Sequence, residues 1–331
     1  MELRTGPAAE TALEVIEASP FLDLARAPLA PGKFVDPAWT AKGEPRASVS
    51  LEALKTLWLN TGTLCNLACK SCYIESSPRN DALLYLTLAE ADRFLDELAE
   101  PIEVGLTGGE PFMNPDIVAM LTSALRRGHR LLVLTNAMRP MRRHEASLRE
   151  LSRGHPGQLT LRVSLDHHSR SVHEAERGPR TWDKAIEGLR WIAQAGIRHA
   201  VAGRLLPGET EVEARSGYAR LFASLGLALD ADDPAALVMF PEMDEAADVA
   251  EISEGCWDVL GLTPAVAMCH SSRMIVHRKG VAAAEVAACT LLPYDPQFLL
   301  GPSLRDARRT VSLNHPHCAR FCVLGGARCS G

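Results

Sequence analysis

Three cysteines, Cys65, Cys69 and Cys72, lie in the segment TGTLCNLACKSCY with the spacing C-x3-C-x2-C. Three thiolates on one tight loop suit an iron–sulfur cluster in which one iron keeps no protein ligand. Such an open iron can bind a substrate or a cofactor directly. Zinc is the alternative, but structural zinc sites need four closed ligands, commonly arranged as C-x-x-C pairs. The spacing therefore favours an iron–sulfur site at this loop.

The chain contains nine cysteines, an odd number that fits poorly with a framework of disulfides. The six beyond the first loop all follow residue 255: Cys256, Cys269, Cys289, Cys318, Cys322 and Cys329. In a reducing compartment, grouped cysteines bind metal more often than they pair with one another. Cys256 lies in a helical pattern beside Trp257, so we interpret it as packing.

A second motif, Thr-Gly-Gly-Glu-Pro at residues 107–111, follows a short apolar run. Gly108 and Gly109 lack a side chain, so the backbone can approach a ligand closely at the end of a strand. Glu110 adds a carboxylate to the same turn. An ordinary Gly-Gly-Glu turn without a ligand is the alternative interpretation.

Short apolar strands alternate with amphipathic helices from residue 56 onward. The expected strands are residues 57–61, 102–107, 130–136, 159–166, 199–205 and 236–240. The expected helices are residues 87–100, 115–127, 141–153, 182–195, 211–225 and 246–260. The first of these helices opens with Thr87 and Glu90 in capping-box spacing. Six alternating strand–helix units predict an α/β fold, a partial (β/α)6 TIM-like barrel with a parallel sheet.

The expected barrel divides the chain into three parts. Residues 1–54 are rich in Ala, Pro and Glu, and form a lead-in that is partly helical near residues 10–18. Residues 55–261 form the barrel. Residues 262–331 form a small cysteine-rich α+β extension, in which residues 274–276 pair with residues 286–289 and residues 304–309 make a short helix.

Length and charge exclude several classes of protein. At 331 residues, the chain has room for about two domains. Its net charge of −6 argues against nucleic acid or an anionic membrane as the main partner. The sequence contains no run of 18 apolar residues, so it predicts no membrane span, and the charged N-terminus lacks an apolar signal core. We therefore expect a cytoplasmic protein.

The cysteine loop followed by TGGEP resembles the radical S-adenosylmethionine enzymes over residues 56–241. In such enzymes a reduced 4Fe–4S cluster cleaves S-adenosylmethionine to methionine and a 5′-deoxyadenosyl radical, which abstracts hydrogen from a substrate. The resemblance implies that Cys65, Cys69 and Cys72 hold this cluster. It also implies a reducing partner such as a flavodoxin or a ferredoxin.

The resemblance further assigns residues at strand ends to the bound S-adenosylmethionine, since parallel barrels work from their C-terminal face. Glu110 is expected at the amino group of the cofactor and Arg177 at its carboxylate. The full set of expected cofactor contacts is Tyr73, Gly108, Gly109, Glu110, Asn136, Ser164, Asp166, Arg177 and Arg204. The family usually has an aromatic residue before the third cysteine, but this chain has Ser71 there, and Tyr73 follows the cysteine instead.

The C-terminal cysteines look like the shorter SPASM/twitch extensions that carry one auxiliary 4Fe–4S cluster. The expected ligands are Cys269, Cys289, Cys318 and Cys322, and Cys329 either replaces one of them or remains free. Four protein ligands would close the cluster and favour electron transfer, so that the net reaction is an oxidation. A zinc site with the same four sulfurs is the alternative.

The substrate is expected at the mouth of the barrel, between the two metal sites. The polar candidates for contacting it are Glu75, His167, His168, Glu242 and Asp244. The lead-in is shorter than the leader-binding domains of many peptide-modifying relatives, which favours a small molecule or an unescorted peptide. Ribosomal-peptide maturation remains the alternative. A non-enzymatic electron carrier would need neither TGGEP nor the barrel.

Overall fold

The computed structural model describes residues 19–22, 24–241 and 244–329. Its centre is a nine-stranded sheet in the order β10-β9-β8-β2-β3-β4-β5-β6-β7. Neighbouring strands from β8 to β7 are parallel, whereas β9 pairs antiparallel with both β8 and β10. The strands are β2 Thr56–Asn60, β3 Glu103–Thr107, β4 Arg130–Thr135, β5 Leu159–Ser164, β6 Arg198–Arg204, β7 Leu237–Phe240, β8 Ser272–Val276, β9 Glu285–Ala287 and β10 Leu299–Gly301.

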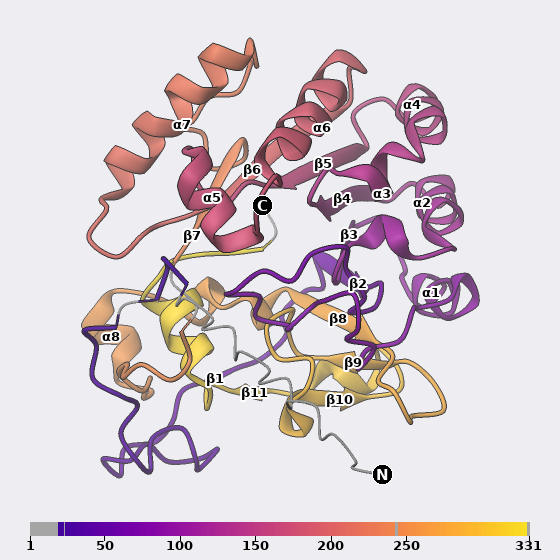
Figure 1. The fold of residues 1–331 in the computed structure, drawn as a ribbon. Helices are drawn as coiled ribbons and strands as arrows, with labels where there is room; N and C mark the ends of the chain where they lie inside the picture. Colours follow the sequence, from indigo (N-terminus) through magenta and orange to yellow (C-terminus); the bar gives the residue numbers. More distant parts are fainter. Residues whose placement is uncertain (1–18, 23, 242–243, 330–331) are drawn as a thin grey trace, which may run out of the picture.

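The larger helices follow the outer face of this curved sheet, so that the structure is a partial barrel rather than a closed one (Figure 1). The helices are α1 Leu88–Leu95, α2 Ile117–Arg126, α3 Arg139–Arg142, α4 Glu145–Gly154, α5 Arg170–Arg177, α6 Trp182–Gln194, α7 Glu211–Leu225 and α8 Cys256–Leu260. None of the described helices is long and apolar enough to cross a membrane.

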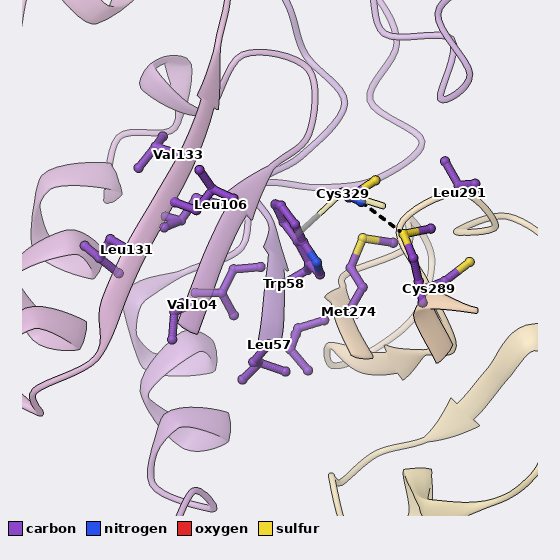
Figure 2. Close-up of a cluster of buried hydrophobic side chains, with 14 of the residues drawn as sticks. Leu57, Trp58, Val104, Leu106, Leu131, Val133, Met274, Cys289, Leu291 and Cys329 are labelled. Carbon is purple, nitrogen blue, oxygen red and sulfur yellow. Dashed lines mark hydrogen bonds between the residues drawn. The ribbon is translucent and has the colours of Figure 1, made fainter. Parts of the chain in front are cut away.

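The strands near the centre of the sheet are covered on both faces, as the β2 sequence TLWLN illustrates, because all five of its residues are buried. Successive side chains of a strand alternate between the two faces. Trp58 faces the inside of the barrel, where Figure 2 shows it near Met274 and Cys329. A Cβ on Gly105 of the neighbouring strand would lie 2.3 Å from the Trp58 ring, so only glycine leaves space for this indole.

The alternating pattern predicted all six barrel strands to within two residues at each end. The capping box of Thr87 and Glu90 is also confirmed, since each side chain accepts a backbone N–H of the other residue. The expected helix at residues 141–153 is interrupted at His144, which separates α3 from α4. The helix expected at residues 10–18 lies outside the described residues.

One helix prediction was wrong: of residues 246–260, only Cys256–Leu260 are helical. The first part of this segment instead exchanges backbone hydrogen bonds with the lead-in. Leu29 N–H donates to the Ala246 carbonyl at 2.6 Å, and Ala47 N–H donates to the Ile252 carbonyl at 2.9 Å. These tertiary hydrogen bonds replace the helical ones, which a local pattern cannot reveal.

The C-terminal extension joins the barrel sheet through β8, which pairs in parallel with β2. The expected hairpin between β8 and β9 is confirmed. The expected short helix appears as a single 3₁₀ turn, Asp306–Arg308. A two-stranded sheet of β1 Ser48–Val49 and β11 Val311–Ser312 ties the extension to the lead-in, and a π-helical turn, Cys318–Val323, follows.

Candidate functional site

A single cavity opens where the barrel strands end, and it collects residues from the first cysteine loop, the strand ends and the C-terminal extension. Its lining residues include Cys65, Cys69, Cys72, Tyr73, Gly108, Gly109, Asn136, Ser164, Asp166, Arg177 and Arg204. Of the residues expected at the first cluster and its cofactor, only Glu110 is missing from this lining. Residues more than 130 positions apart therefore meet at one site, as the parallel topology requires.

The cysteine loop is held by its own backbone and by a buried carboxylate. The N–H of Ser76 donates to Cys72 Sγ at 3.3 Å, and the N–H of Leu67 donates to Cys65 Sγ at 3.4 Å. Burial raises the pKa of Cys65 to about 12 and that of Cys69 to about 11. In the absence of a cation, these two thiols are therefore protonated at neutral pH, and a bound metal would displace their protons.

Glu176 of α5 fixes the residue that precedes the third cysteine. Its Oε1 accepts both the N–H and the hydroxyl of Ser71 at 2.6 Å, while its Oε2 accepts the hydroxyl of Ser19 at 2.5 Å. Sequence reasoning missed Glu176, Ser19 and the helix α5. The signal available was the position of Glu176 directly before Arg177, a residue already assigned to the site.

Ser71, the residue before the third cysteine, belongs to this polar network. The Arg204 guanidinium donates to the Ser71 hydroxyl and, at 3.3 Å, to its carbonyl. The same guanidinium lies 5.5 Å from the centre of the Phe21 ring, which is buried. Residues 19–22 of the lead-in therefore pack beside the cysteine loop.

The Gly-Gly-Glu turn presses against the cysteine loop. Gly108 has a φ of +132°, and a Cβ on Gly109 would lie 2.3 Å from the Leu64 carbonyl oxygen. The Glu110 side chain turns towards the next strand, where it accepts the Thr135 hydroxyl at 2.9 Å and the Asn136 N–H at 2.8 Å. Burial raises the pKa of Glu110 to about 7. The glycines thus provide close backbone approach, and Glu110 joins β3 to β4.

Asp166 and two arginines form the charged part of the cavity. The Arg177 guanidinium donates to both Asp166 oxygens, at 2.6 and 2.9 Å, and Arg204 Nε lies 3.5 Å from the same carboxylate. Burial by itself would raise the pKa of Asp166, but the two guanidiniums offset burial and lower it to about 2. Asp166 is therefore ionised at neutral pH and orients Arg177.

Four of the C-terminal cysteines line a second, smaller cavity, and the fifth does not. The second cavity is lined by Cys269, Cys289, Cys318 and Cys322, together with apolar residues and His317. Cys329 lines the first cavity instead. The Thr290 hydroxyl donates to its Sγ at 3.3 Å, and Arg162 donates to its carbonyl at 2.5 Å. Cys329 therefore lies at the border of the two cavities, since its backbone N–H donates at 3.4 Å to Met268 Sδ, and Met268 lines the second one.

Arg273 is a fully buried cation beside this second group. Its guanidinium donates to the carbonyls of Cys269 at 2.5 Å, Ala307 at 2.8 Å and Ser272 at 2.8 Å. Among the described residues it has no carboxylate partner. Cys256, by contrast, lies in α8, where Ser253 N–H donates to its Sγ at 3.4 Å, away from both cavities.

The residues expected to contact a substrate do not line the first cavity in the part of the chain that the structure describes. His167 bonds to Ser169 and Glu209, and His168 stacks on His167 and meets Tyr218 edge-on. Glu75 has a φ of +51°, and its carbonyl accepts the Asn80 side chain. Asp244 accepts the N–H of Ala246. Glu242 lies outside the described residues.

Comparison with known proteins gives one family and several relatives. Residues 59–216 match the model of the Radical SAM superfamily. The subtilosin biosynthesis protein AlbA of Bacillus subtilis is 28% identical over 141 residues, 42% of this chain and 30% of AlbA. An AdoMet-dependent heme synthase of Oleidesulfovibrio alaskensis is 28% identical over 41% of this chain and 34% of the relative. The mycofactocin maturase MftC of Mycobacterium tuberculosis is 28% identical over 40% of this chain and 33% of MftC.

Among solved structures, the fold resembles Streptococcus suis SuiB bound to S-adenosylmethionine, with a TM-score of 0.54, 13% identity, and coverage of 75% of this chain and 63% of SuiB. It also resembles anSMEcpe with bound AdoMet, with a TM-score of 0.53 and 14% identity. This likeness covers 76% of this chain and 80% of anSMEcpe. These likenesses confirm the partial-barrel fold. The chain spans about a third of the length of the curated relatives it matches.

Proposed function

We propose that the protein is a radical SAM enzyme acting on a peptide or small-molecule substrate, since residues 59–216 match the model of the Radical SAM superfamily. The observation that carries the proposal is the convergence of three cysteines, the glycine turn and the Asp166–Arg177 pair on one cavity. When bound there, a 4Fe–4S cluster and S-adenosylmethionine supply reductive cleavage of the sulfonium and radical abstraction of hydrogen.

The residues present fit both groups. Cys65, Cys69 and Cys72 supply three soft sulfur donors, the set that suits an iron–sulfur cluster with one open iron. A Cβ on Gly109 would collide with the loop backbone, so this turn is shaped for close packing behind the cluster loop. Asn136, Ser164 and Arg204 add further polar groups to the same cavity, where S-adenosylmethionine would lie.

The chain's own residues organise this site before any ligand binds. Asp166 holds the Arg177 guanidinium in two hydrogen bonds, and Glu176 holds the backbone of Ser71 beside Cys72. Because these partners are buried, their hydrogen bonds are stronger than in water and fix the side chains in one geometry. Phe240 and Leu291 add apolar surface to the same cavity.

We further propose that Cys269, Cys289, Cys318 and Cys322 hold a second 4Fe–4S cluster. Arg273 supports this assignment, because a fully buried guanidinium without an acidic partner among the described residues calls for a nearby anion. A metal held by four thiolates carries net negative charge and meets that need. A zinc ion held by the same four thiolates would also carry net negative charge, so a measurement of metal content has to distinguish zinc from iron.

A peptide substrate is supported by two of the relatives, a bacteriocin biosynthesis protein and a mycofactocin maturase by name. A solved SuiB structure bound to its precursor peptide SuiA, with a TM-score of 0.55 and 12% identity, has the same fold. We also propose a low-potential reducing partner such as a flavodoxin or ferredoxin. All nine cysteines are free in the structure, which agrees with a reducing, cytoplasmic location.

Anaerobic reconstitution tests the function. With dithionite and S-adenosylmethionine, the protein should form 5′-deoxyadenosine, and Cys72→Ala should abolish this product because only two of the three loop ligands remain. Wild-type protein that forms no 5′-deoxyadenosine while carrying iron would contradict the proposal. About eight irons per chain would indicate two 4Fe–4S clusters, whereas about four irons with one zinc would assign zinc to the second site.

A further inference from the structure

The cavity is lined by both polar and apolar residues. The polar lining includes the three loop cysteines and the Asp166–Arg177 pair. The apolar lining consists of Ile74, Leu134, Ala202, Phe240, Leu291 and Phe321. Phe240, Leu291 and Phe321 are not among the residues proposed to hold the cluster and S-adenosylmethionine, so they are available to a substrate group.

The charges of the cavity are already paired with one another. Its charged lining residues, among those the structure describes, are Asp166, Arg177 and Arg204. Asp166 contacts both guanidiniums, and Arg204 also donates to Ser71. Both arginines come from the barrel side of the cavity, β6 and α5. An ionic group on the substrate would therefore enter beside the apolar lining without a free counter-charge, at a large desolvation cost.

The apolar lining comes from both the barrel and the C-terminal extension. Phe240, the last residue of β7, and Phe321, in the π-helical turn, stack with ring centres 5.5 Å apart and an angle of 37°. Leu291 and Cys329 add further surface from the extension. The sequence element that carries the second cysteine group therefore also shapes the first cavity.

One buried polar atom of the cavity has no partner. The Ser76 side chain is 5% exposed, lines the cavity, and its hydroxyl makes no hydrogen bond within the described chain. A single hydroxyl can serve one neutral hydrogen-bonding group, such as a backbone amide. It cannot replace the hydration of an ion.

We propose that the substrate group received beside Phe240 and Phe321 is an uncharged apolar side chain, with Ser76 left to bond a neighbouring amide. This inference rests on the proposed function, because it assigns the substrate half of the same cavity. The residues expected from the sequence, among them Glu75 and His167, are outside the lining, which agrees with a substrate group that needs no ionic partner.

The test uses reconstituted protein with S-adenosylmethionine present, and four probes: N-acetyl amides of leucine, phenylalanine, lysine and glutamate. Saturation-transfer NMR should show binding of the leucine and phenylalanine probes and none of the two charged probes. Phe321→Ser should weaken the binding of the apolar probes by about tenfold, whereas Phe321→Leu should retain it. The control is Val259→Ser, because Val259 is 86% exposed and lies outside the cavity.

Binding of the lysine or glutamate probe at least as tight as that of the apolar probes would overturn the inference. So would equal binding of the apolar probes to wild-type protein and to a folded Phe321→Ser variant, checked by circular dichroism. Formation of 5′-deoxyadenosine by the same samples separates the two proposals: its absence from iron-loaded protein contradicts the radical SAM function, whereas its presence with charged-probe binding contradicts only the substrate assignment.

Discussion

The carboxylate of Asp166 holds the guanidinium of Arg177 through two hydrogen bonds, Nε–Oδ2 at 2.6 Å and Nη2–Oδ1 at 2.9 Å. Asp166 follows β5, and Arg177 is the last residue of α5. The pair therefore fixes the β5–α5 connection over the cysteine loop. Since both side chains are largely buried, each determines where the other points.

Asp166→Asn should destabilise the protein by about 3–5 kcal/mol, because it leaves a buried guanidinium without its counter-charge. It should also weaken the binding of S-adenosylmethionine by freeing Arg177. Urea unfolding and calorimetric titration measure the two effects. The matched control is Asp183→Asn, which breaks the Arg170–Asp183 pair. That pair is more than half exposed, so the control should leave the free energy of unfolding nearly unchanged. Equal losses in the two variants would contradict a special role for Asp166.

Glu176→Gln should loosen the cysteine loop, because the neutral amide is a weaker acceptor for the N–H and hydroxyl of Ser71. We expect a loss of about 2 kcal/mol in unfolding free energy and faster removal of iron from the first site by a chelator. Glu187→Gln is the control, since Glu187 is mostly exposed and contacts no cysteine loop residue. Chelation rates that match wild type would show that Glu176 does not hold the loop.

Cys289→Ala and Cys329→Ala should differ in metal content. Cys289 lines the second cavity and Cys329 the first. Loss of Cys289 should therefore lower the iron of reconstituted protein from about eight to about four per chain, whereas loss of Cys329 should leave it near eight. Iron and zinc analysis of the two variants settles the ligand set. Loss of the second metal in Cys329→Ala would place Cys329 among the ligands instead.

Gly105→Ala should destabilise the barrel by about 1–3 kcal/mol, since the added methyl overlaps the Trp58 ring inside a packed core. Gly154→Ala, at the end of α4, provides the opposite case. A Cβ there meets nothing within 4 Å, so this change should stabilise the protein by up to about 1 kcal/mol. Thermal unfolding of the two variants compares them directly, and a neutral Gly105→Ala would mean that the Trp58 ring can move.

The sequence predicted the barrel well because each of its elements is encoded locally. The alternation of apolar runs with amphipathic helices predicts β2 to β7, and Thr87 with Glu90 marks the start of α1. The prediction was wrong at residues 246–255, where backbone hydrogen bonds to the lead-in replace helical ones. Those bonds join residues about 200 positions apart, and no local pattern records them.

The sequence by itself therefore determined the cysteine motif, the glycine turn and the positions of the barrel strands along the chain, because each depends on residue type and short spacing. The tertiary structure alone decided the rest of the site. Ser19 and Glu176 meet across 157 positions, and Cys329 joins the first cavity although it follows the second cysteine group in sequence. Such proximity arises from how the lead-in and the extension pack against the barrel, and side chains that meet only after folding leave no periodic or spacing signal in the sequence.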